Sequence, residues 1–553
     1  MSTAFTDKRS IGQIFSTRRI FLVVVFLGLF GMAARNVIDP DVWWHLRTGE
    51  YIATHHSVPH SDPFSYTRAG EPWVAHEWLT ELLLYGLQCV TGWAGLIVVF
   101  AAVLCAAFYL LYLRCGPNPF AAGVLTLAAA WATMPVWGVR PQILSLLLMS
   151  LWLLILERSE GNAKLLWWTL PLMLLWVNLH AGFALGLALS ILFIAGELLE
   201  RVLGRSQQSA PRLRFAGLVL FLDLLIVPLN PNGLRLFTYP IETLRSTAMQ
   251  DYIAEWASPN FHHAEYLPFL LVALATFAAL AWSRVKVRPR EVVLLILSLY
   301  AGLCSIRTIP LFVWIAVPLL ARNLDQSLKR WPARRSQLLR PLPASRAALN
   351  APILLAMAVF VGIHIFQVIQ RQPRAEAQNF PTRAVAFLQS HPANRRIFNH
   401  YDWGGYLIWR LYPSTPVFID GRADLYGKEM LDQFASTYGF KDDWRKTLQG
   451  WNVDTVIVPA DSALATGLRS APGWTVAYED DQAIVLTASP PATRHASARL
   501  LPSAPKKIHP PDQFAGYYEW YQIPSAEENR TQVLKGYRPS IRVGKLFHKV
   551  EFS

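Results

Sequence analysis

The sequence predicts a polytopic α-helical membrane protein of about eleven transmembrane helices, with a small α/β domain towards the C-terminus. Hydrophobic residues make up 53% of the 553-residue chain and charged residues only 16%, a balance typical of membrane proteins. Apolar runs that approach the ~20 residues needed to cross a bilayer recur as far as residue 370. Lysine and arginine collect in short loops between these runs, so membrane topology explains the net charge of +14 and no nucleic-acid partner is predicted.

The first apolar run, IFLVVVFLGLFGMAA, follows basic residues and has the composition of a secretory signal. Arg35 and the stretch NVIDPD stand where a small-residue cleavage site would be expected, so the sequence predicts an uncleaved first membrane helix. Ten further apolar runs complete the set. The helices are expected at residues 20–38, 93–113, 119–137, 142–157, 164–178, 181–200, 214–229, 266–282, 291–306, 308–321 and 351–370.

Three strongly basic loops, at residues 201–214, 283–291 and 322–346, each follow an even-numbered predicted helix. They therefore share one side of the membrane with the basic N-terminus, residues 1–19, and the positive-inside rule makes that side the cytoplasm. Anionic lipids of the cytoplasmic leaflet attract these loops. The parts expected outside the cytoplasm are residues 39–92, residues 230–265 and the chain after residue 371.

Four domains are predicted: a cytoplasmic N-terminus (1–19), a transmembrane domain (20–370) with its outer loop 39–92, a soluble α/β domain (371–490), and an extended or poorly ordered tail (491–553). Within the α/β domain, period and composition separate helices from strands. Helices are expected at TRAVAFLQSHP, GGYLIWRL and KEMLDQFASTYGF, and strands at RIFNH, TPVFIDGR, DTVIVPA and the two halves of WTVAYEDDQAIVLTA.

The outer loop opens with DPDVWWHLRTGEYI, which predicts a helix. Asp39 can cap the free backbone N–H groups of a helix, and Pro40 suits the first helical position. Asp41 and His45, four residues apart, then stand on one face.

This helix also carries an apolar stripe, which predicts that it lies flat on the outer membrane surface. Trp43 and Trp44 are expected at the depth of the lipid headgroups. The stripe consists of Val42, Leu46, Gly49 and Ala53.

A capped surface helix alone does not explain the number of titratable side chains in this loop. One carboxylate is enough for a cap, yet Asp41, His45 and Arg47 follow Asp39. Functional residues concentrate on such loops. The same loop adds Asp62, His76 and Glu77.

These motifs resemble the GT-C superfamily of integral membrane glycosyltransferases, which includes protein O-mannosyltransferases, aminoarabinose transferases and oligosaccharyltransferase subunits. The resemblance rests on paired acids at the outer end of the first membrane helix, many further spans and a soluble C-terminal domain, and it extends to about residue 490. A bacterial subgroup of uncharacterised members is similar at DPDVWWHLRTGEYI, DPFSYT, PWVAHEWL, WVNLHAGFALG, NPNGLRLF, EWASPNF and FIDGRADLYG.

The resemblance implies transfer of a sugar from a polyprenyl-phosphate donor to a glycan, lipid or protein acceptor on the outer side of the membrane. An acid of the first outer loop acts as general base or holds a divalent cation, and positive charge stabilises the leaving phosphate. Asp39 and Asp41 are the expected acidic pair, with His45 orienting or sharing their task. A metal at Asp41 would be Mg²⁺ or Mn²⁺, which prefer oxygen ligands.

Arg140 and Arg307, each expected at the outer end of a helix beside a proline, are candidates for binding the lipid phosphate, because guanidinium pairs with phosphate through two parallel hydrogen bonds. For Asn178 and His180, a hairpin turn held by bonds to backbone competes with contact to substrate. The remaining candidates for substrate binding are Trp44, Arg47, Asp62, His76 and Glu77.

Two motifs of the α/β domain, HYDWGGYL and FIDGRADLYG, place acids beside glycines. His400 and Asp402 in the first, and Asp420 with Arg422 in the second, could contact an acceptor or dock the domain, and Asp-Gly is also a common turn.

The alternative function is a non-catalytic membrane transporter, flippase or envelope-polymer assembly protein. A transporter would be expected to carry charges in mid-helix, and Asp223 is the clearest such residue in this sequence.

Overall fold

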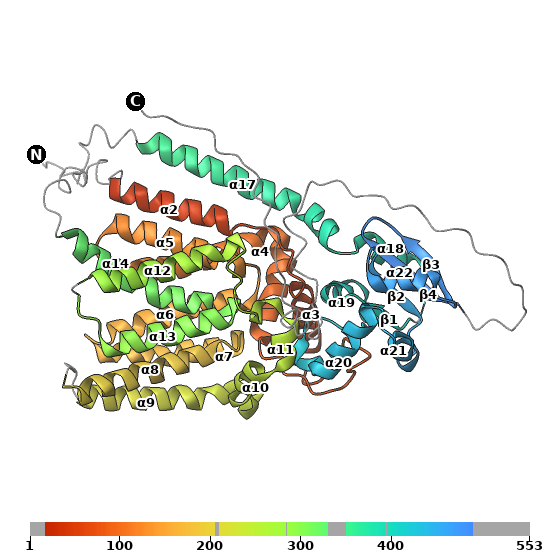
Figure 1. The fold of residues 1–553 in the computed structure, drawn as a ribbon, viewed down its shortest axis with the longest axis horizontal. Helices are drawn as coiled ribbons and strands as arrows, with labels where there is room; N and C mark the ends of the chain where they lie inside the picture. The colour runs from red at the N-terminus through yellow and green to blue at the C-terminus, as the bar shows by residue number, and fades with distance from the viewer. Residues whose placement is uncertain (1–16, 205–209, 284, 330–349, 394, 490–553) are drawn as a thin grey trace, which may run out of the picture. The chain divides into compact units, whose positions relative to one another are not determined.

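The computed structural model describes residues 17–204, 210–283, 285–329, 350–393 and 395–489. The predicted N-terminal segment before Thr17, most of loop 322–346 and the tail 491–553 lie outside the described residues. The membrane part is a bundle of long helices (Figure 1). These are α2 (Thr17–Ala33), α4 (Trp78–Arg114), α5 (Pro119–Thr133), α6 (Pro141–Arg158), α7 (Thr169–Leu179), α8 (Phe183–Val202), α9 (Ala210–Ile226), α12 (Leu267–Trp282), α13 (Pro289–Cys304), α14 (Ile309–Lys329) and α17 (Asn350–Asn379).

Each of the eleven predicted ranges overlaps one of these helices. Two helices are longer than predicted: α4 begins at Trp78 and turns sharply at Gly92, and α17 continues to Asn379 past Pro373, across the predicted domain boundary. Among the described residues, seven helices are long and apolar enough to cross a membrane. The helical membrane fold is thus confirmed, and the count of eleven spans stays a prediction.

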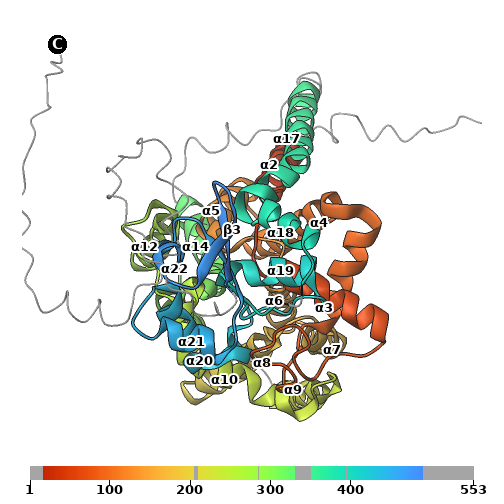
Figure 2. The ribbon, with the colours of Figure 1, turned by 90° about the vertical axis from the view of Figure 1, so that its right-hand side faces the viewer.

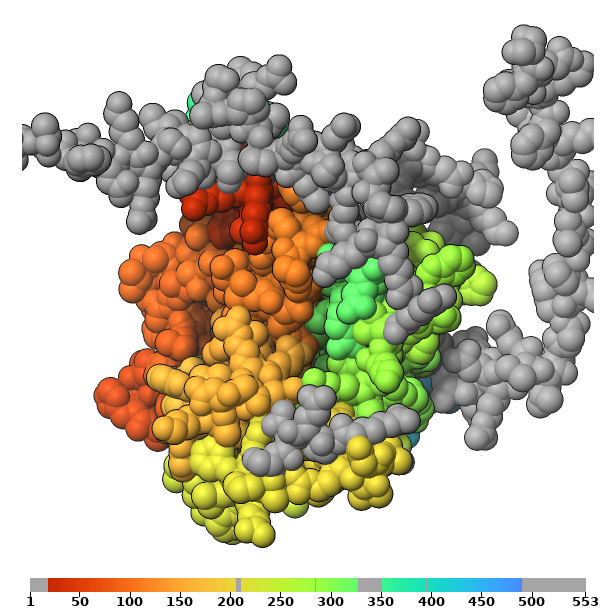
Figure 3. Space-filling view, turned by 90° about the vertical axis from the view of Figure 1, so that its left-hand side faces the viewer, coloured from red at the N-terminus to blue at the C-terminus, as the bar shows by residue number. Residues whose placement is uncertain are grey.

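At the end of the bundle predicted to face the cytoplasm, basic side chains pair with carboxylates. Nη2 of Arg114 lies 2.7 Å from Oε1 of Glu157, and Nη1 of Arg322 lies 2.6 Å from Oε1 of Glu291. The coloured surface seen from this end belongs almost entirely to the bundle (Figure 3). The basic side chains at this end therefore form ion pairs that join neighbouring helices.

The C-terminal part contains a four-stranded sheet of order β1-β2-β4-β3, in which only β1 and β2 are parallel. Its helices lie around this sheet and face the viewer in Figure 2. The predicted small α/β domain is therefore present. Its elements are α18 (Thr382–Ser390), β1 (Ile397–Asn399), α19 (Gly404–Leu411), α20 (Ala423–Tyr438), α21 (Trp444–Gly450), β2 (Thr455–Pro459), α22 (Ala463–Ser470), β3 (Trp474–Glu479) and β4 (Ala483–Ala488).

One predicted strand, TPVFIDGR, is wrong: residues 415–422 do not join the sheet. The backbone N–H of Val417 instead donates to the carbonyl of Phe64 at 3.2 Å, and the N–H of Tyr66 donates to Val417 at 3.1 Å. The outer loop thus supplies the pairing partner that the sequence pattern assigned to a neighbouring strand.

The prediction that Trp43 and Trp44 of the first outer helix, α3 (Val42–His55), lie among the lipid headgroups is also wrong. Trp43 is only 1% exposed, and its ring centroid lies 4.8 Å from that of Tyr406 and 5.0 Å from that of Trp93. Trp44 is buried as well. The helix packs between α4 and α19 because the C-terminal domain covers its outer face. An apolar stripe indicates burial, but it does not distinguish lipid from protein as the cover.

The predicted cap differs by two residues. The helix begins at Val42, and Asp41 precedes it without a side-chain capping bond. Oδ1 of Asp39 accepts a hydrogen bond from the N–H of Asp41 at 2.9 Å. Asp39 therefore closes a turn before the helix, and Pro40 lies in that turn.

The burial of Trp43 predicts a large cost for its removal. Trp43→Ala should lower the free energy of unfolding by about 3–5 kcal/mol, because a large core side chain leaves a cavity. Trp168→Ala is the control, since Trp168 is 65% exposed, and a shift within about 0.5 kcal/mol is expected for it. Thermal unfolding in detergent measures both. Equal stabilities of the two variants would contradict the buried position.

Candidate functional site

Segments predicted on one face of the membrane come together at the end of the bundle that carries the C-terminal domain. Trp78, which begins α4, donates from Nε1 to Oδ1 of Asn178 at the end of α7, at 2.8 Å. The hydroxyl of Ser305, before α14, donates to the carbonyl of Glu255 at 2.9 Å. The outer loop, the α7–α8 turn and the α13–α14 turn therefore line one polar region.

Asp41 lies at the start of α3 within this region. Its Oδ1 accepts a hydrogen bond from Nε1 of Trp44 at 3.1 Å. Burial raises the pKa of Asp41 above its ordinary value, and it outweighs the opposite effects of His45, the Trp44 bond and the positive charge of Arg307. A carboxyl with a raised pKa and no ion pair among the described residues has the properties of a proton acceptor.

His45 lies one turn beyond Asp41 and is held by a second acid. Its Nδ1 lies 3.3 Å from Oε1 of Glu81, and both side chains are buried. Burial acts to lower the pKa of His45, but the bond to Glu81 and the charge of Glu77 give a net rise. Glu81 was not among the predicted residues. Its spacing of four from Glu77 at the start of a helix is the sequence signal that could have indicated it.

His76 and Glu77 form an ion pair beside this histidine, with Nε2 of His76 3.0 Å from Oε1 of Glu77. Burial acts to raise the pKa of Glu77, yet the charge of His76 and its hydrogen bond hold that pKa well below its usual range. His180, bonded through Nδ1 to the hydroxyl of Ser145 at 2.8 Å, has its pKa lowered to about 3, mainly by burial. His180 is therefore neutral and Glu77 is charged.

The two acids predicted as a pair have different surroundings. Asp39 forms an ion pair with Arg140, and Arg140 forms a second one with Glu255. This chain of charges joins the residues after α2, the start of α6 and the connection before α12. Asp39 and Arg140 thus neutralise each other, whereas Asp41 forms no ion pair among the described residues.

Arg307 is the other predicted phosphate ligand, and it has no hydrogen bond or ion pair among the described residues. Its guanidinium carbon lies 5.9 Å from the centre of the Trp256 ring. Its charge acts on Asp41 and Glu77, which places it near both. A guanidinium with unused donors beside a proton acceptor can bind an anion.

Arg47 and Asp62 each have structural partners in the C-terminal domain. Arg47 donates to Glu50 at 2.5 Å and to the carbonyl of Trp409, and it stacks on the Trp409 ring at 5.0 Å. The outer loop is thereby attached to α19.

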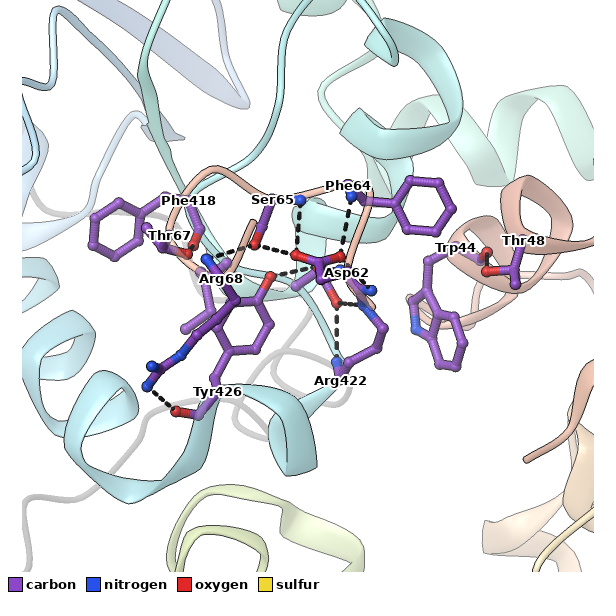
Figure 4. A network of polar contacts seen from close by, with 12 residues as sticks. Trp44, Thr48, Asp62, Phe64, Ser65, Thr67, Arg68, Phe418, Arg422 and Tyr426 are labelled. Carbon is purple, nitrogen blue, oxygen red and sulfur yellow. Dashed lines mark hydrogen bonds and ion pairs between the residues drawn. The ribbon is translucent and has the colours of Figure 1, made fainter. Parts of the chain in front are cut away.

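Asp62 belongs to a buried network with the C-terminal domain (Figure 4). Nη1 of Arg422 donates to Oδ1 of Asp62 at 2.7 Å, and Nε and Nη2 donate to the two oxygens of Asp420 at 2.7 Å. The hydroxyl of Tyr426 donates to Asp420 at 2.6 Å. All three charged side chains are buried, so Asp62 fixes the loop rather than lining the site.

The C-terminal domain also brings polar side chains towards Asp41. Burial and the charge of Asp41 raise the pKa of Asp402 to about 7. The hydroxyl of Tyr401 is buried with no hydrogen-bond partner in the described chain. The HYDWGGYL motif therefore lies beside the start of α3.

The described residues contain no ready cluster of metal ligands. No three His, Cys, Asp or Glu side chains among them are grouped so that they could hold a metal ion. Asp39 and Glu77, the neighbouring acids, are engaged in ion pairs with Arg140 and His76. The metal at Asp41 stays a prediction, and no step below depends on it.

No protein-family model matches the chain, and no curated protein matches it. Among solved structures, the archaeal oligosaccharyltransferase AglB from Archaeoglobus fulgidus, in complex with an inhibitory peptide and a dolichol-phosphate, is 11% identical, with a TM-score of 0.50 over 80% of this chain and 69% of AglB. This likeness shows the fold: the chain is a multi-pass membrane protein with the GT-C glycosyltransferase fold.

Two further structures are similar. The arabinofuranosyltransferase AftD from Mycobacteria is 16% identical with a TM-score of 0.49, over 86% of this chain but only 40% of AftD. ArnT from Cupriavidus metallidurans, bound to undecaprenyl phosphate, is 13% identical with a TM-score of 0.45, over 84% of this chain and 96% of ArnT. The chain thus spans less than half the length of AftD.

The buried network gives a prediction for stability. Arg422→Met should lower the free energy of unfolding by about 3–5 kcal/mol, because two buried carboxylates lose their shared cation. Lys428→Met is the control: its pairs with Asp251 and Asp432 are exposed, and such pairs contribute about 0–1 kcal/mol. Denaturation in detergent compares them, and a similar small loss for both variants would contradict the proposed importance of the network.

Proposed function

We propose that this chain is a membrane glycosyltransferase that moves a sugar from a polyprenyl-phosphate donor to a hydroxyl of a glycan, lipid or protein acceptor. The fold supports a transferase of this class, and AglB and ArnT are described in complex with dolichol-phosphate and undecaprenyl phosphate. One observation carries the proposal: Asp41, a carboxylate with a raised pKa, lies close enough to Arg307 for the charge of Arg307 to act on it. The N–H donors of Arg307 have no partner among the described residues.

Asp41 acts as general base in this proposal. The acceptor hydroxyl must lose its proton as its oxygen attacks the anomeric carbon, and a base is most effective when its pKa lies near the working pH. The pKa of Asp41 is raised by burial, whereas Asp39 is tied to Arg140 and Glu77 to His76. Asp41 therefore fits the role better than either neighbour.

Arg307 binds the phosphate of the donor. Negative charge grows on the leaving phosphate as the glycosidic bond breaks, and a guanidinium donates two parallel hydrogen bonds to such a group. Arg140 would first have to leave Asp39 and Glu255. His45 is held by Glu81 and lies one turn from Asp41. The charge of His45 stabilises the ionised form of the Asp41 carboxylate.

The site faces the extracytoplasmic side of a bacterial inner membrane in this proposal, with the N-terminus in the cytoplasm. The basic loops at the opposite end of the bundle support this orientation. The transporter alternative gains no support from Asp223, whose Oδ2 accepts a hydrogen bond from Thr169 at 2.9 Å and so links α9 to α7.

Substitution of the base should abolish transfer without unfolding the protein. We expect Asp41→Asn to lower the rate of transfer of labelled sugar from polyprenyl phosphate by about 100-fold or more. The wild-type rate should fall as the pH drops through the raised pKa of Asp41, so the acid limb lies above the ordinary aspartate value of about 3.9. Asp251→Asn, at an exposed outer position, is the control. Full activity of Asp41→Asn would rule out this assignment.

Removal of the unpaired arginine should weaken donor binding. Arg307→Gln should reduce the affinity for polyprenyl phosphate about 10- to 100-fold, the value of hydrogen bonds to a charged group, with little change in thermal stability. Arg245→Gln, an exposed arginine of the outer connection, should bind as the wild type does. Binding of fluorescent polyprenyl phosphate in detergent measures the effect. Unchanged affinity of Arg307→Gln would place the phosphate elsewhere.

A further inference from the structure

A glycine of the C-terminal domain touches the carboxylate of Asp41. A Cβ atom on Gly421 would overlap Oδ1 of Asp41 and would lie 3.3 Å from Nε1 of Trp44. Gly421 has no left-handed backbone conformation, so the close approach, and not the backbone geometry, requires a glycine here. The Asp41 carboxylate is thus held between Trp44 of its own helix and the backbone of a distant segment.

The segment that carries Gly421 is firmly anchored. Arg422, the next residue, donates to Asp420 and Asp62, and its guanidinium lies 4.6 Å from the Trp73 ring centre. These groups are fully buried, and a buried charged network with every partner in place resists displacement. Gly421 therefore cannot withdraw from Asp41 without breaking this network.

The outer loop holds the same segment from its other side. The hydroxyl of Thr67 donates to the carbonyl of Phe418 at 2.6 Å, and Nη2 of Arg68 donates to the carbonyl of Tyr426 at 2.7 Å. Figure 4 shows these bonds beside the Asp62–Arg422 pair. Thr67 and Arg68 belong to the same outer loop as Asp41, and they hold the chain on either side of Gly421.

A second glycine approaches the same turn from α19. A Cβ atom on Gly405 would lie 2.6 Å from the carbonyl oxygen of Pro40 and 3.2 Å from Cδ1 of Trp44. The backbone of residues 40–44 is therefore confined by the C-terminal domain at two points, one at the main chain and one at the carboxylate.

We propose that the C-terminal domain positions the general base: Gly421, anchored by Arg422, sets the place of the Asp41 carboxylate. This inference rests on the proposed function for its catalytic consequence. Gly421 acts through Asp41 and is a positioning residue. Displacement of a catalytic group by about 1 Å can cost about 100-fold in rate, so contact with the domain is needed for catalysis.

Gly421→Ala tests the proposal, because it displaces the carboxylate without changing its charge. We expect kcat for sugar transfer to fall about 100-fold, while the KM for the polyprenyl-phosphate donor stays within about threefold. Gly450→Ala is the matched control in the same domain: a Cβ atom there meets nothing within 4 Å, and wild-type kinetics are expected. Wild-type kcat in Gly421→Ala would overturn the proposal.

Hydrogen–deuterium exchange separates this proposal from the proposed function. The amides of residues 39–46 should exchange faster in Gly421→Ala than in Gly450→Ala, whether or not the donor tested is the correct one. Equal exchange would overturn the positioning role. Faster exchange with no transfer by the wild type would overturn only the proposed function, and faster exchange with full kcat would overturn the catalytic consequence.

If Gly421→Ala does not fold, Arg422→Lys provides the second variant. Lysine keeps the charge but cannot donate to both carboxylates as the guanidinium does, so the anchor loosens without a new atom beside Asp41. We expect kcat to fall about tenfold with donor KM unchanged. An unchanged kcat in this variant would overturn the proposal.

Discussion

The contact between the outer loop and the C-terminal domain depends on one buried cation, Arg422, between Asp62 and Asp420. Removing these charges from water costs several kcal/mol per ion, and only nearly complete hydrogen bonding offsets that cost. The backbone N–H groups after Asp62 and the hydroxyl of Tyr426 supply the remaining bonds. The loop and the domain must therefore fold against each other, and α3 is enclosed between the bundle and the domain as a result.

The same principle governs the charges around Asp41. In a region with little water, a neighbouring opposite charge strongly stabilises a charged group. Glu77 has His76 beside it, Glu81 has His45, and Asp39 has Arg140, whereas Asp41 accepts its hydrogen bond from the neutral indole of Trp44. A carboxylate with weak compensation gains most from binding a proton, and this difference separates Asp41 from Asp39 and Glu77.

Much of the fold could be predicted from the sequence, because long apolar runs have few alternatives to membrane helices. The grouping of Asn178, Glu255 and Arg307 at one end follows from counting helices. What the sequence could not show is which surface covers α3, since apolar stripes are the same against lipid and against protein. It also could not assign partners: Asp62 and Arg140 have the residue types of ligands, and the structure gives each an internal ion pair. Such pairing depends on contacts between distant parts of the chain.

The glycines of the C-terminal domain illustrate a signal that was visible but could be interpreted in two ways. An Asp-Gly dipeptide such as Asp420-Gly421 usually marks a turn. Gly421, and likewise Gly404 and Gly405 of the HYDWGGYL motif, nevertheless have backbone angles that other residues can adopt. Each is small because another backbone or a carboxylate lies where a side chain would be. Gly405 and Gly421 meet residues of the first outer loop, so the domain fits closely around the start of α3. A domain attached only as an appendage would not need that fit, and the close contacts at Gly405 and Gly421 therefore join the C-terminal domain to the outer loop.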